Sequence, residues 1–126
     1  MRYNTYYSWM NWEILFHPDV EIWISRLNQK EYEAVIASLD ALEEVGPALG
    51  RPFVDHIKNS LFTNVKELRP PATILRILFA FDFNRRAVLL VGGNKNKNWS
   101  KWYEKNIPMA DKRFEKHIKS KGENNA

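Results

Sequence analysis

Between Gly92 and Tyr103 the sequence concentrates residue types that can bind a phosphate chain and stack on bases. An apolar run ends at the glycine pair Gly92-Gly93, and lysines then alternate with aromatic residues: Lys95, Lys97, Trp99, Lys101, Trp102 and Tyr103. A cation can hold a phosphate while an aromatic ring stacks on a base, and each stacked base contributes about 1–3 kcal/mol. Because glycines lack a Cβ, we expect the pair to end the strand with a kink, to aim the lysines and to let another backbone, or a nucleic-acid backbone, approach closely.

A second group of cations lies on the strands that precede this segment. Alternation predicts a strand over residues 73–82 with one apolar face, formed by Leu75, Ile77, Phe79 and Phe81. The Arg76 guanidinium should therefore emerge on the other face. Lys66 and Arg69, on a candidate strand over residues 65–69, can lie across from Arg76. We expect these side chains and Lys95 to converge on one electropositive hollow.

Each of these residues also has a purely structural interpretation. Arg76 can form an ion pair with Glu67 or Asp82. Lys66 and Lys95 can be ordinary surface lysines. Trp102 and Tyr103 can be core anchors of a last helix, since large aromatic residues are usually buried.

The charge of the chain is concentrated near its C-terminal end. Residues 1–93 carry 10 Lys and Arg against 11 Asp and Glu, whereas residues 94–121 carry nine against three. Such asymmetry favours a polyanionic partner, although a solvated, lysine-rich helix would show it too.

Several kinds of site and location have no sequence signal. His17, His56 and His117 are too far apart for a metal motif, and the chain has no cysteine. The glycine pair fits neither a Rossmann fingerprint nor a P-loop, so we expect no metal and no nucleotide cofactor. No apolar run approaches the ~20 residues of a membrane span, and the N-terminus lacks a signal peptide. We therefore expect a cytoplasmic protein without a membrane partner.

The predicted elements make a small α+β domain. A short strand over 12–16 precedes a helix with the apolar stripe Val20, Trp23, Ile24 and Leu27. Asn28 and Glu31 resemble a capping box that begins a second helix, with the buried stripe Tyr32, Val35, Ile36, Leu39 and Leu42. A loop through residues 50–60 leads to antiparallel strands over 65–69, 73–82 and 87–91, and a last helix begins near Ser100 and is interrupted at Pro108.

This order predicts one curved, mainly antiparallel sheet with an N-terminal helical hairpin and a C-terminal helix, the helices packed on one face. Residues 12–121 are the single domain, preceded by a leader (1–11) and followed by a polar tail (122–126).

Five segments, in this order and spacing, resemble the HigB/RelE-type toxins of bacterial type II toxin–antitoxin systems, and more narrowly their phage-derived, host-killing branch. They are GPALGRP (46–52), NVKELRP (64–70), LRILFAFD (75–82), LLVGGNK (89–95) and WYEKNIPMAD (102–111). The resemblance covers roughly Trp12 to Ile118. After the double glycine this chain has Asn94, Lys95 and Asn96 where the family often has Asp then Lys-Thr.

The resemblance implies a RelE-like fold and cleavage of mRNA on the ribosome, which inhibits translation. It also implies a cognate antitoxin, often with a helix-turn-helix domain, whereas the oligomeric state stays open. RNA supplies its own 2′-OH nucleophile, so such a toxin needs a base, an acid and cations that stabilise the phosphorane, but no metal.

By position, the resemblance assigns these catalytic roles to four residues. Arg76 would stabilise the phosphorane, Lys95 would contact phosphate, Lys66 would be the base with repulsion from Arg69 favouring its neutral form, and Tyr103 would be an acid or stack on a base. Further RNA contacts would come from Arg69, Lys97, Trp99 and Lys101.

Two other functions stay open. A ParE-like relative shares the fold but inhibits DNA gyrase without being a nuclease. A non-catalytic nucleic-acid-binding module would show salt-sensitive binding and no cleaved product.

Overall fold

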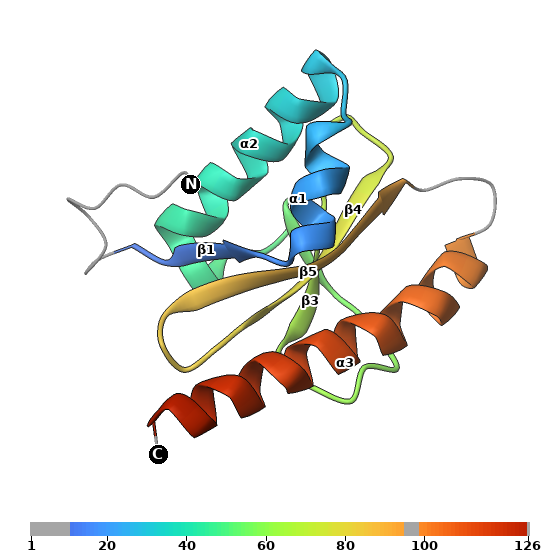
Figure 1. Cartoon of the computed structure of the whole chain (residues 1–126). Coiled ribbons are helices and arrows are strands. Elements are labelled where there is room, and N and C mark those ends of the chain that lie inside the picture. The colour runs from blue at the N-terminus through green and yellow to red at the C-terminus, as the bar shows by residue number, and fades with distance from the viewer. Residues whose placement is uncertain (1–10, 95–98, 126) are drawn as a thin grey trace.

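Figure 1 shows the computed structural model of the chain, which describes residues 11–94 and 99–125. Within these residues five strands form a sheet in the order β1-β5-β4-β3-β2. They are β1 (Glu13–Phe16), β2 (Val54–His56), β3 (Val65–Leu68), β4 (Leu75–Phe81) and β5 (Arg86–Asn94). β1 pairs in parallel with β5, and the other neighbouring pairs are antiparallel. The predicted α+β class with a mainly antiparallel sheet is confirmed.

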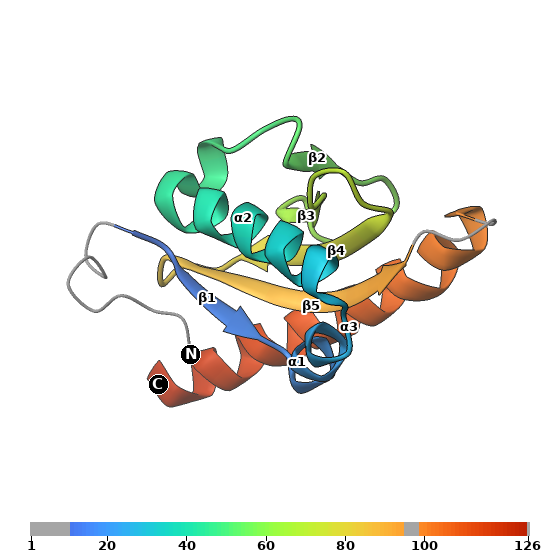
Figure 2. The same cartoon turned by 90° about the horizontal axis from the view of Figure 1, so that it is seen from above.

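Helices cover both faces of the sheet, so the prediction that they pack on one face is wrong. α1 (Pro18–Ser25) and α2 (Gln29–Val45), with the 3-10 turn η2 (Gly46–Ala48), lie above the sheet, and α3 (Trp99–Asn125) lies below it (Figure 1). The view from above shows α2 crossing the upper face and α3 running beneath (Figure 2). The physical reason is that β4 and β5 are apolar on both faces, and each face must be shielded from water.

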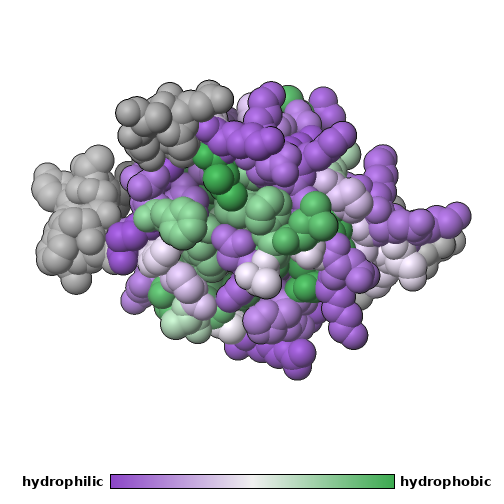
Figure 3. Space-filling view, turned by 90° about the horizontal axis from the view of Figure 1, so that it is seen from below, coloured by the Kyte–Doolittle hydropathy of each residue, from purple (hydrophilic) through white to green (hydrophobic). Residues whose placement is uncertain are grey.

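Two buried clusters result, one on each side of the sheet. The upper core, between the sheet and α1 and α2, includes Val35, Leu39, Leu42, Ile77 and Phe79. The lower core, between the sheet and α3, includes Leu78, Ala80, Leu90, Ile107, Ala110 and Phe114. Seen from below, the side that carries α3 shows apolar side chains gathered in the middle of the face and polar ones around them (Figure 3).

Local sequence explains where α2 begins. The Asn28 side chain accepts a hydrogen bond from the Glu31 amide at 2.8 Å, and the Glu31 carboxylate accepts one from the Asn28 amide at 3.1 Å. The predicted capping box is therefore confirmed. Tyr32, predicted to be in the buried stripe, is instead 43% exposed.

α3 is one continuous helix, and the predicted interruption at Pro108 is wrong. Proline removes the hydrogen bond to the carbonyl four residues earlier, that of Glu104. Pro108 and Glu104 both lie on the exposed side of α3, where water can satisfy that carbonyl. The helix also continues through residues 122–125, which the sequence assigned to a polar tail. The predicted leader lies outside the described residues except for Asn11.

The glycine pair lies inside β5 and does not end the strand as predicted. Gly92 pairs with Ile77 and Gly93 with Arg76. A Cβ at Gly92 would lie 2.4 Å from the Trp23 ring, and a Cβ at Gly93 would lie 2.4 Å from Trp102 Nε1. The glycines therefore make room for two indole rings of the protein itself, one from α1 and one from α3, and not for a nucleic-acid backbone.

Two other features complete the scaffold. β2 is a three-residue edge strand in a segment that the sequence analysis predicted to be a loop. Across the described part of the chain, none of the helices combines the length and apolar character that crossing a membrane requires.

Candidate active site

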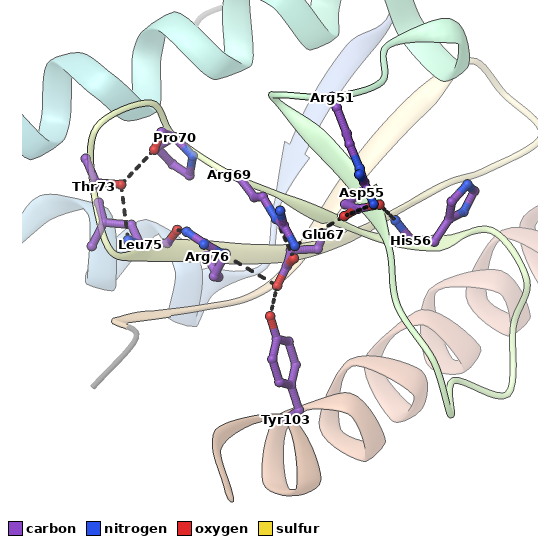
Figure 4. A network of polar contacts seen from close by, with 10 residues as sticks. All are labelled: Arg51, Asp55, His56, Glu67, Arg69, Pro70, Thr73, Leu75, Arg76 and Tyr103. Carbon is purple, nitrogen blue, oxygen red and sulfur yellow. Dashed lines mark hydrogen bonds and ion pairs between the residues drawn. The ribbon is translucent and has the colours of Figure 1, made fainter. Parts of the chain in front are cut away.

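A buried carboxylate, Glu67 of β3, is the centre of the candidate site. Its side chain is 1% exposed. The Tyr103 hydroxyl donates a hydrogen bond to Oε1, and Arg69 Nε donates one to Oε2 at 2.8 Å. Arg76 Nε lies 3.7 Å from Oε1 (Figure 4). Burying a carboxylate is strongly unfavourable unless it is paired, so Glu67 holds these three groups around itself, and the four residues form the Glu67 cluster.

Strand periodicity places these residues on one face. Glu67 pairs with Leu78, and the Arg76 side chain lies two residues before Leu78 on the same, lower side of β4. Tyr103 reaches Glu67 from the first turns of α3, below the sheet (Figure 4). The prediction that Arg76 emerges on the face opposite Leu75 and Ile77 is confirmed.

Arg69 extends this cluster toward solvent. Its guanidinium contacts Asp55 Oδ2 at 3.3 Å, and Arg51 contacts the same oxygen at 3.2 Å. Burial lowers the pKa of Arg69, but Glu67 and Asp55 raise it by more, and the net shift is upward. The His56 amide, which donates a hydrogen bond to Asp55, and the two arginines lower the pKa of Asp55. Arg69 is 38% exposed, so it carries a permanent charge at the surface of the cluster.

Arg76 is held more tightly. Its Nη1 donates a hydrogen bond to the Leu75 carbonyl at 2.7 Å, and its guanidinium carbon lies 5.3 Å from the centre of the Trp99 ring. A cation over an indole face is attracted to the ring. Trp99 also stacks on Tyr103, with ring centres 5.3 Å apart and planes at 29°. The start of α3 therefore fixes both the cation and the phenol.

The Tyr103 hydroxyl is a proton donor at neutral pH. Burial, the hydrogen bond to Glu67 and the Glu67 charge together raise its pKa from 10.0 to about 12, against the opposing effect of Arg76 and Arg69. The same carboxylate thus contacts two guanidinium groups and, together with burial, raises the pKa of the phenol.

A cavity of about 290 Å³ opens beside this cluster. It is lined by His56, Ile57, Lys58, Asn59, Glu67, Arg69, Tyr103 and Ile107. The lining combines apolar residues, cations and the central carboxylate, so apolar surface and a few polar groups meet in one cavity.

Lys66 does not join the other predicted residues, and this placement corrects the expectation of one shared hollow. It pairs with Phe79, a residue of the upper core, and its Nζ lies 5.8 Å from the centre of the Phe81 ring. The physical reason is strand alternation, which sends Lys66 and Glu67 to opposite faces of β3.

The structure describes only some of the remaining predicted residues. Lys95 and Lys97 lie outside the described residues, so their expected phosphate contacts stay predictions. Lys101 is an exposed residue of α3, and Trp99 is half-buried against Arg76.

Sequence reasoning missed the central role of Glu67, which it considered only as a partner of Arg76, and it missed Asp55. One signal was present for Glu67. Val65 and Glu67 alternate on β3 and Arg69 follows the strand at the same spacing, so an apolar Val65 on one face predicts a carboxylate on that face beside a cation. Asp55 had no signal because its strand was not predicted. Among the residues that the structure describes, no group of three or more His, Cys, Asp or Glu could hold a metal ion.

Comparison with known proteins identifies the family. The family model described as "Phage derived protein Gp49-like (DUF891)" matches residues 22–115, which include all four residues of the Glu67 cluster. The protein named "Putative toxin HigB3" of Mycobacterium tuberculosis (strain ATCC 25618 / H37Rv) is 50% identical over 107 residues, which cover 85% of this chain and 94% of that protein. "Putative toxin HigB2" of the same organism is 44% identical over 102 residues, which cover 79% of this chain and 51% of that protein.

A solved structure supports the fold independently. A chain of the archaeal RelE–RelB complex from Pyrococcus horikoshii OT3 superposes with a TM-score of 0.58 at 15% identity, covering 71% of this chain and 100% of that chain. At this identity the similarity concerns the fold alone, and the predicted RelE-like fold is confirmed. The chain belongs to the phage-derived Gp49-like family and is a HigB-type toxin of a toxin–antitoxin system, with a RelE-like fold.

Proposed function

We propose that this toxin is a metal-independent endoribonuclease that cleaves mRNA on the translating ribosome and so inhibits translation in the cytoplasm. One observation carries the proposal: the Arg76 guanidinium is held between a carboxylate and an indole ring, and a protonated tyrosine lies on the same carboxylate. Oriented cations beside a proton donor are what in-line attack by a 2′-OH requires.

The chemistry needs no group from outside the protein and the RNA. The 2′-oxygen attacks the adjacent phosphorus, a new O–P bond forms, and the bond from phosphorus to the 5′-oxygen breaks. The products are a 2′,3′-cyclic phosphate and a 5′-hydroxyl. Arg76 and Arg69 stabilise the extra negative charge of the phosphorane, because their guanidinium groups are already oriented when the charge develops.

Two groups of the cluster move the protons. We assign to Glu67 the acceptance of the 2′-OH proton, because it lies beside Arg76 and Tyr103 whereas Lys66 lies on the opposite face of the sheet. Tyr103, protonated because its pKa is about 12, gives its proton to the leaving 5′-oxygen. The hydrogen bond between Tyr103 and Glu67 lets the proton return from the carboxylic acid to the phenolate and restores the starting state.

The test combines expression in bacteria with cleavage by the purified protein. We expect growth arrest and new mRNA 5′ ends in cells that express the toxin, and cleavage of RNA on purified ribosomes in the presence of EDTA. Arg76→Ala should abolish these effects, whereas the matched control Arg26→Ala, an exposed arginine that follows α1, should not. Intact messages in cells that contain folded toxin would overturn the proposal, and damage to DNA without cleaved messages would indicate a gyrase inhibitor.

We further propose that a cognate antitoxin with a helix-turn-helix domain suppresses the activity. The archaeal RelE was solved as a RelE–RelB complex, so a protein that shares this fold binds a partner protein. Co-expression with the product of the neighbouring gene should restore growth and yield a complex of the two proteins. Continued growth arrest despite a soluble neighbouring gene product would contradict this pairing.

A further inference from the structure

A groove on the lower side of the molecule lies between α3 and the loop that joins β2 to β3. Its volume is about 710 Å³, and its lining includes Asn59 and Leu61 of the loop and Pro108, Met109, Lys112 and Glu115 of α3. The four residues of the Glu67 cluster lie outside this lining. The groove is therefore a second surface feature, distinct from the candidate active site.

A buried carboxylate of α3 fixes the loop that forms one wall of the groove. Asp111 is 5% exposed. Its Oδ1 accepts a hydrogen bond from Ser60 Oγ at 2.5 Å, and its Oδ2 accepts one from the Leu61 amide at 2.9 Å. Hydrogen bonds to a charged carboxylate are stronger than neutral ones, so the backbone of Leu61 is held firmly against α3.

This anchored backbone presents an apolar side chain to water. The Leu61 side chain is 82% exposed, and Pro108 on the facing helix is exposed as well. Figure 3 shows this side of the molecule, with apolar side chains in the middle of the face and polar ones around them. A single exposed leucine is ordinary, but a fixed leucine at the rim of an apolar groove extends one continuous apolar surface, and such surfaces mark protein interaction sites.

The charge around the groove is positive. Over residues 99–121, α3 carries seven Lys and Arg against three Asp and Glu. Of these acids, Asp111 is buried against the loop, and Glu115 forms an ion pair within α3. Lys112 is exposed in the lining, and Lys58, the residue before Asn59, is exposed on the loop. Charge complementarity therefore favours an acidic partner.

We propose that this groove docks an acidic, amphipathic helix of the antitoxin; the inference rests on the proposed pairing with an antitoxin. Apolar side chains on one face of that helix fill the groove around Leu61 and Met109, and carboxylates beside them pair with Lys112 and Lys58. A protein segment fits better than RNA. The lining, as far as the structure describes it, holds neither an arginine nor an aromatic ring on which a base could stack.

The position of the groove explains how its occupant can suppress the toxin. Asn59 lines both the groove and the cavity beside Glu67. A helix in the groove therefore lies at the edge of the candidate site and blocks the approach of a large substrate. It does so without contacting the Glu67 cluster.

The first experiment measures the affinity of the purified toxin for the purified product of the neighbouring gene by calorimetry. We expect Leu61→Ser and Lys112→Glu each to weaken binding by about tenfold or more, because both remove an anchor at the centre of the contact. The matched controls are Ile22→Ser, at an exposed apolar residue of α1, and Lys30→Glu, at an exposed lysine of α2. They should change the affinity by less than about threefold. Leu61→Ser should cleave RNA like the wild type, since it lies outside the Glu67 cluster.

The possible outcomes separate the groove from the pairing. Losses below about threefold in both groove variants, or equal losses in the controls, would overturn the groove and leave the pairing intact. No complex with the wild type would overturn both. Normal antitoxin binding with lost cleavage on ribosomes would assign the groove to the ribosome. Self-association of the toxin that Leu61→Ser abolishes would assign it to a second copy, and either result would overturn the proposal.

The second experiment locates the contact on both proteins. We expect the methyl NMR signals of Leu61 and Met109 to shift when the antitoxin binds, whereas the Ile22 signal of α1 stays in place. Hydrogen exchange should slow in one antitoxin segment that combines acidic residues with apolar residues at helical spacing. Unshifted Leu61 and Met109 signals in a stable complex, or a protected segment without acidic residues, would overturn the proposal.

Discussion

Two carboxylate-centred networks join the sheet to α3, and they use similar parts in different ways. At one end Glu67 binds Arg69, Arg76 and the α3 residue Tyr103. At the other end Asp82, in the turn between β4 and β5, binds Arg86 at 2.8 Å and the α3 residue His117 at 2.9 Å.

The difference is how exposed the partners of each carboxylate are. Arg86 and His117 are 12% and 16% exposed, and the turn amides of Asn84 and Arg86 donate to the remaining oxygen of Asp82. In the Glu67 network, Arg69 is 38% exposed and lines a cavity with Glu67 and Tyr103, whereas Arg76, at 13%, is as enclosed as Arg86. The comparison teaches that a carboxylate with guanidinium groups and one α3 side chain is a purely structural clamp when its partners are enclosed, as around Asp82. The same combination is a candidate site when one cation is exposed and a cavity lies beside it, as around Glu67.

The sharpest test of this distinction is Arg76→Ala. Removing a preorganised cation that stabilises transition-state charge lowers a rate by about 100- to 1,000-fold, so we expect that loss in RNA cleavage. Glu67 keeps Tyr103 and Arg69 as partners, so the variant should stay folded. Single-turnover cleavage measures the first effect and thermal unfolding the second. Wild-type cleavage by the variant would remove the Glu67 network from the mechanism.

Asp82→Asn should have the opposite pattern, with a loss of stability and normal cleavage by the folded fraction. We expect the free energy of unfolding to fall by about 3 kcal/mol, the lower end for breaking a buried ion pair. Chemical denaturation and cleavage per folded molecule measure the two quantities. Reduced cleavage by folded Asp82→Asn protein would contradict the division between clamp and site.

The pH dependence of the same variant gives a second check. Burial raises the pKa of Asp82, but His117, the Asn84 amide and Arg86 lower it by more, so the folded pKa lies below 3.8. A depressed folded pKa stabilises the protein above the unfolded value, and this stabilisation disappears as the pH falls through the folded one. The stability of the wild type should therefore approach that of Asp82→Asn below about pH 3.8.

The sequence predicted the elements whose signals are local. Asn28 and Glu31 specify the start of α2 by hydrogen bonds between near neighbours, and the alternation of Leu75, Ile77 and Phe79 specifies which way Arg76 points. The signals that failed were ambiguous by nature. A glycine pair predicts the end of a strand or a close contact equally well, and only the fold brings Trp23 and Trp102 to it.

The composition of the site was harder to predict because it depends on register between distant segments. Nothing local indicates that Lys66 lies opposite Phe79 while Glu67 lies opposite Leu78. A shift of one residue would exchange the two faces and would place Lys66 beside Arg76. The link from Asp111 to Ser60 spans 51 residues and depends on the path of α3 in the same way.

Gly93→Ala tests how tightly α3 is fitted to the Glu67 end of the sheet. A Cβ would lie 2.4 Å from Trp102, which packs edge-to-face on both Trp99 and Tyr103. We expect a loss of about 2 kcal/mol from overpacking, together with slower cleavage because Tyr103 moves with its neighbours. Gly50→Ala is the matched control, since no atom lies within 4 Å of its added Cβ. Equal stabilities of the two variants in urea would contradict the close fit.

Tyr103→Phe isolates the phenol of the open network. The variant keeps the ring and loses the hydrogen bond to Glu67, so we expect cleavage to slow about tenfold as the acid is lost. In an alkaline absorbance titration, the wild type should show a phenolate transition near pH 12 that the variant lacks. If the wild type and the variant instead differ by a phenolate transition near pH 10, Tyr103 does not donate a hydrogen bond to Glu67.

Lys66→Ala should have the smallest effect, and it separates the two faces of β3 most directly. Its ammonium lies near the Phe81 ring on the upper side, while Glu67, the adjacent residue, binds the cations and the phenol on the lower side. Cleavage on ribosomes should stay within about twofold of wild type, since a change confined to one half-buried lysine on the upper side leaves the Glu67 contacts intact. Lys66 and Glu67 are adjacent residues of the same strand. If substitutions at the two positions affect cleavage unequally, the face of the sheet on which each side chain lies is therefore the explanation. A large loss in folded Lys66→Ala protein would mean that RNA wraps around the β2 edge and uses both faces, and the division of the site by strand alternation would have to be abandoned.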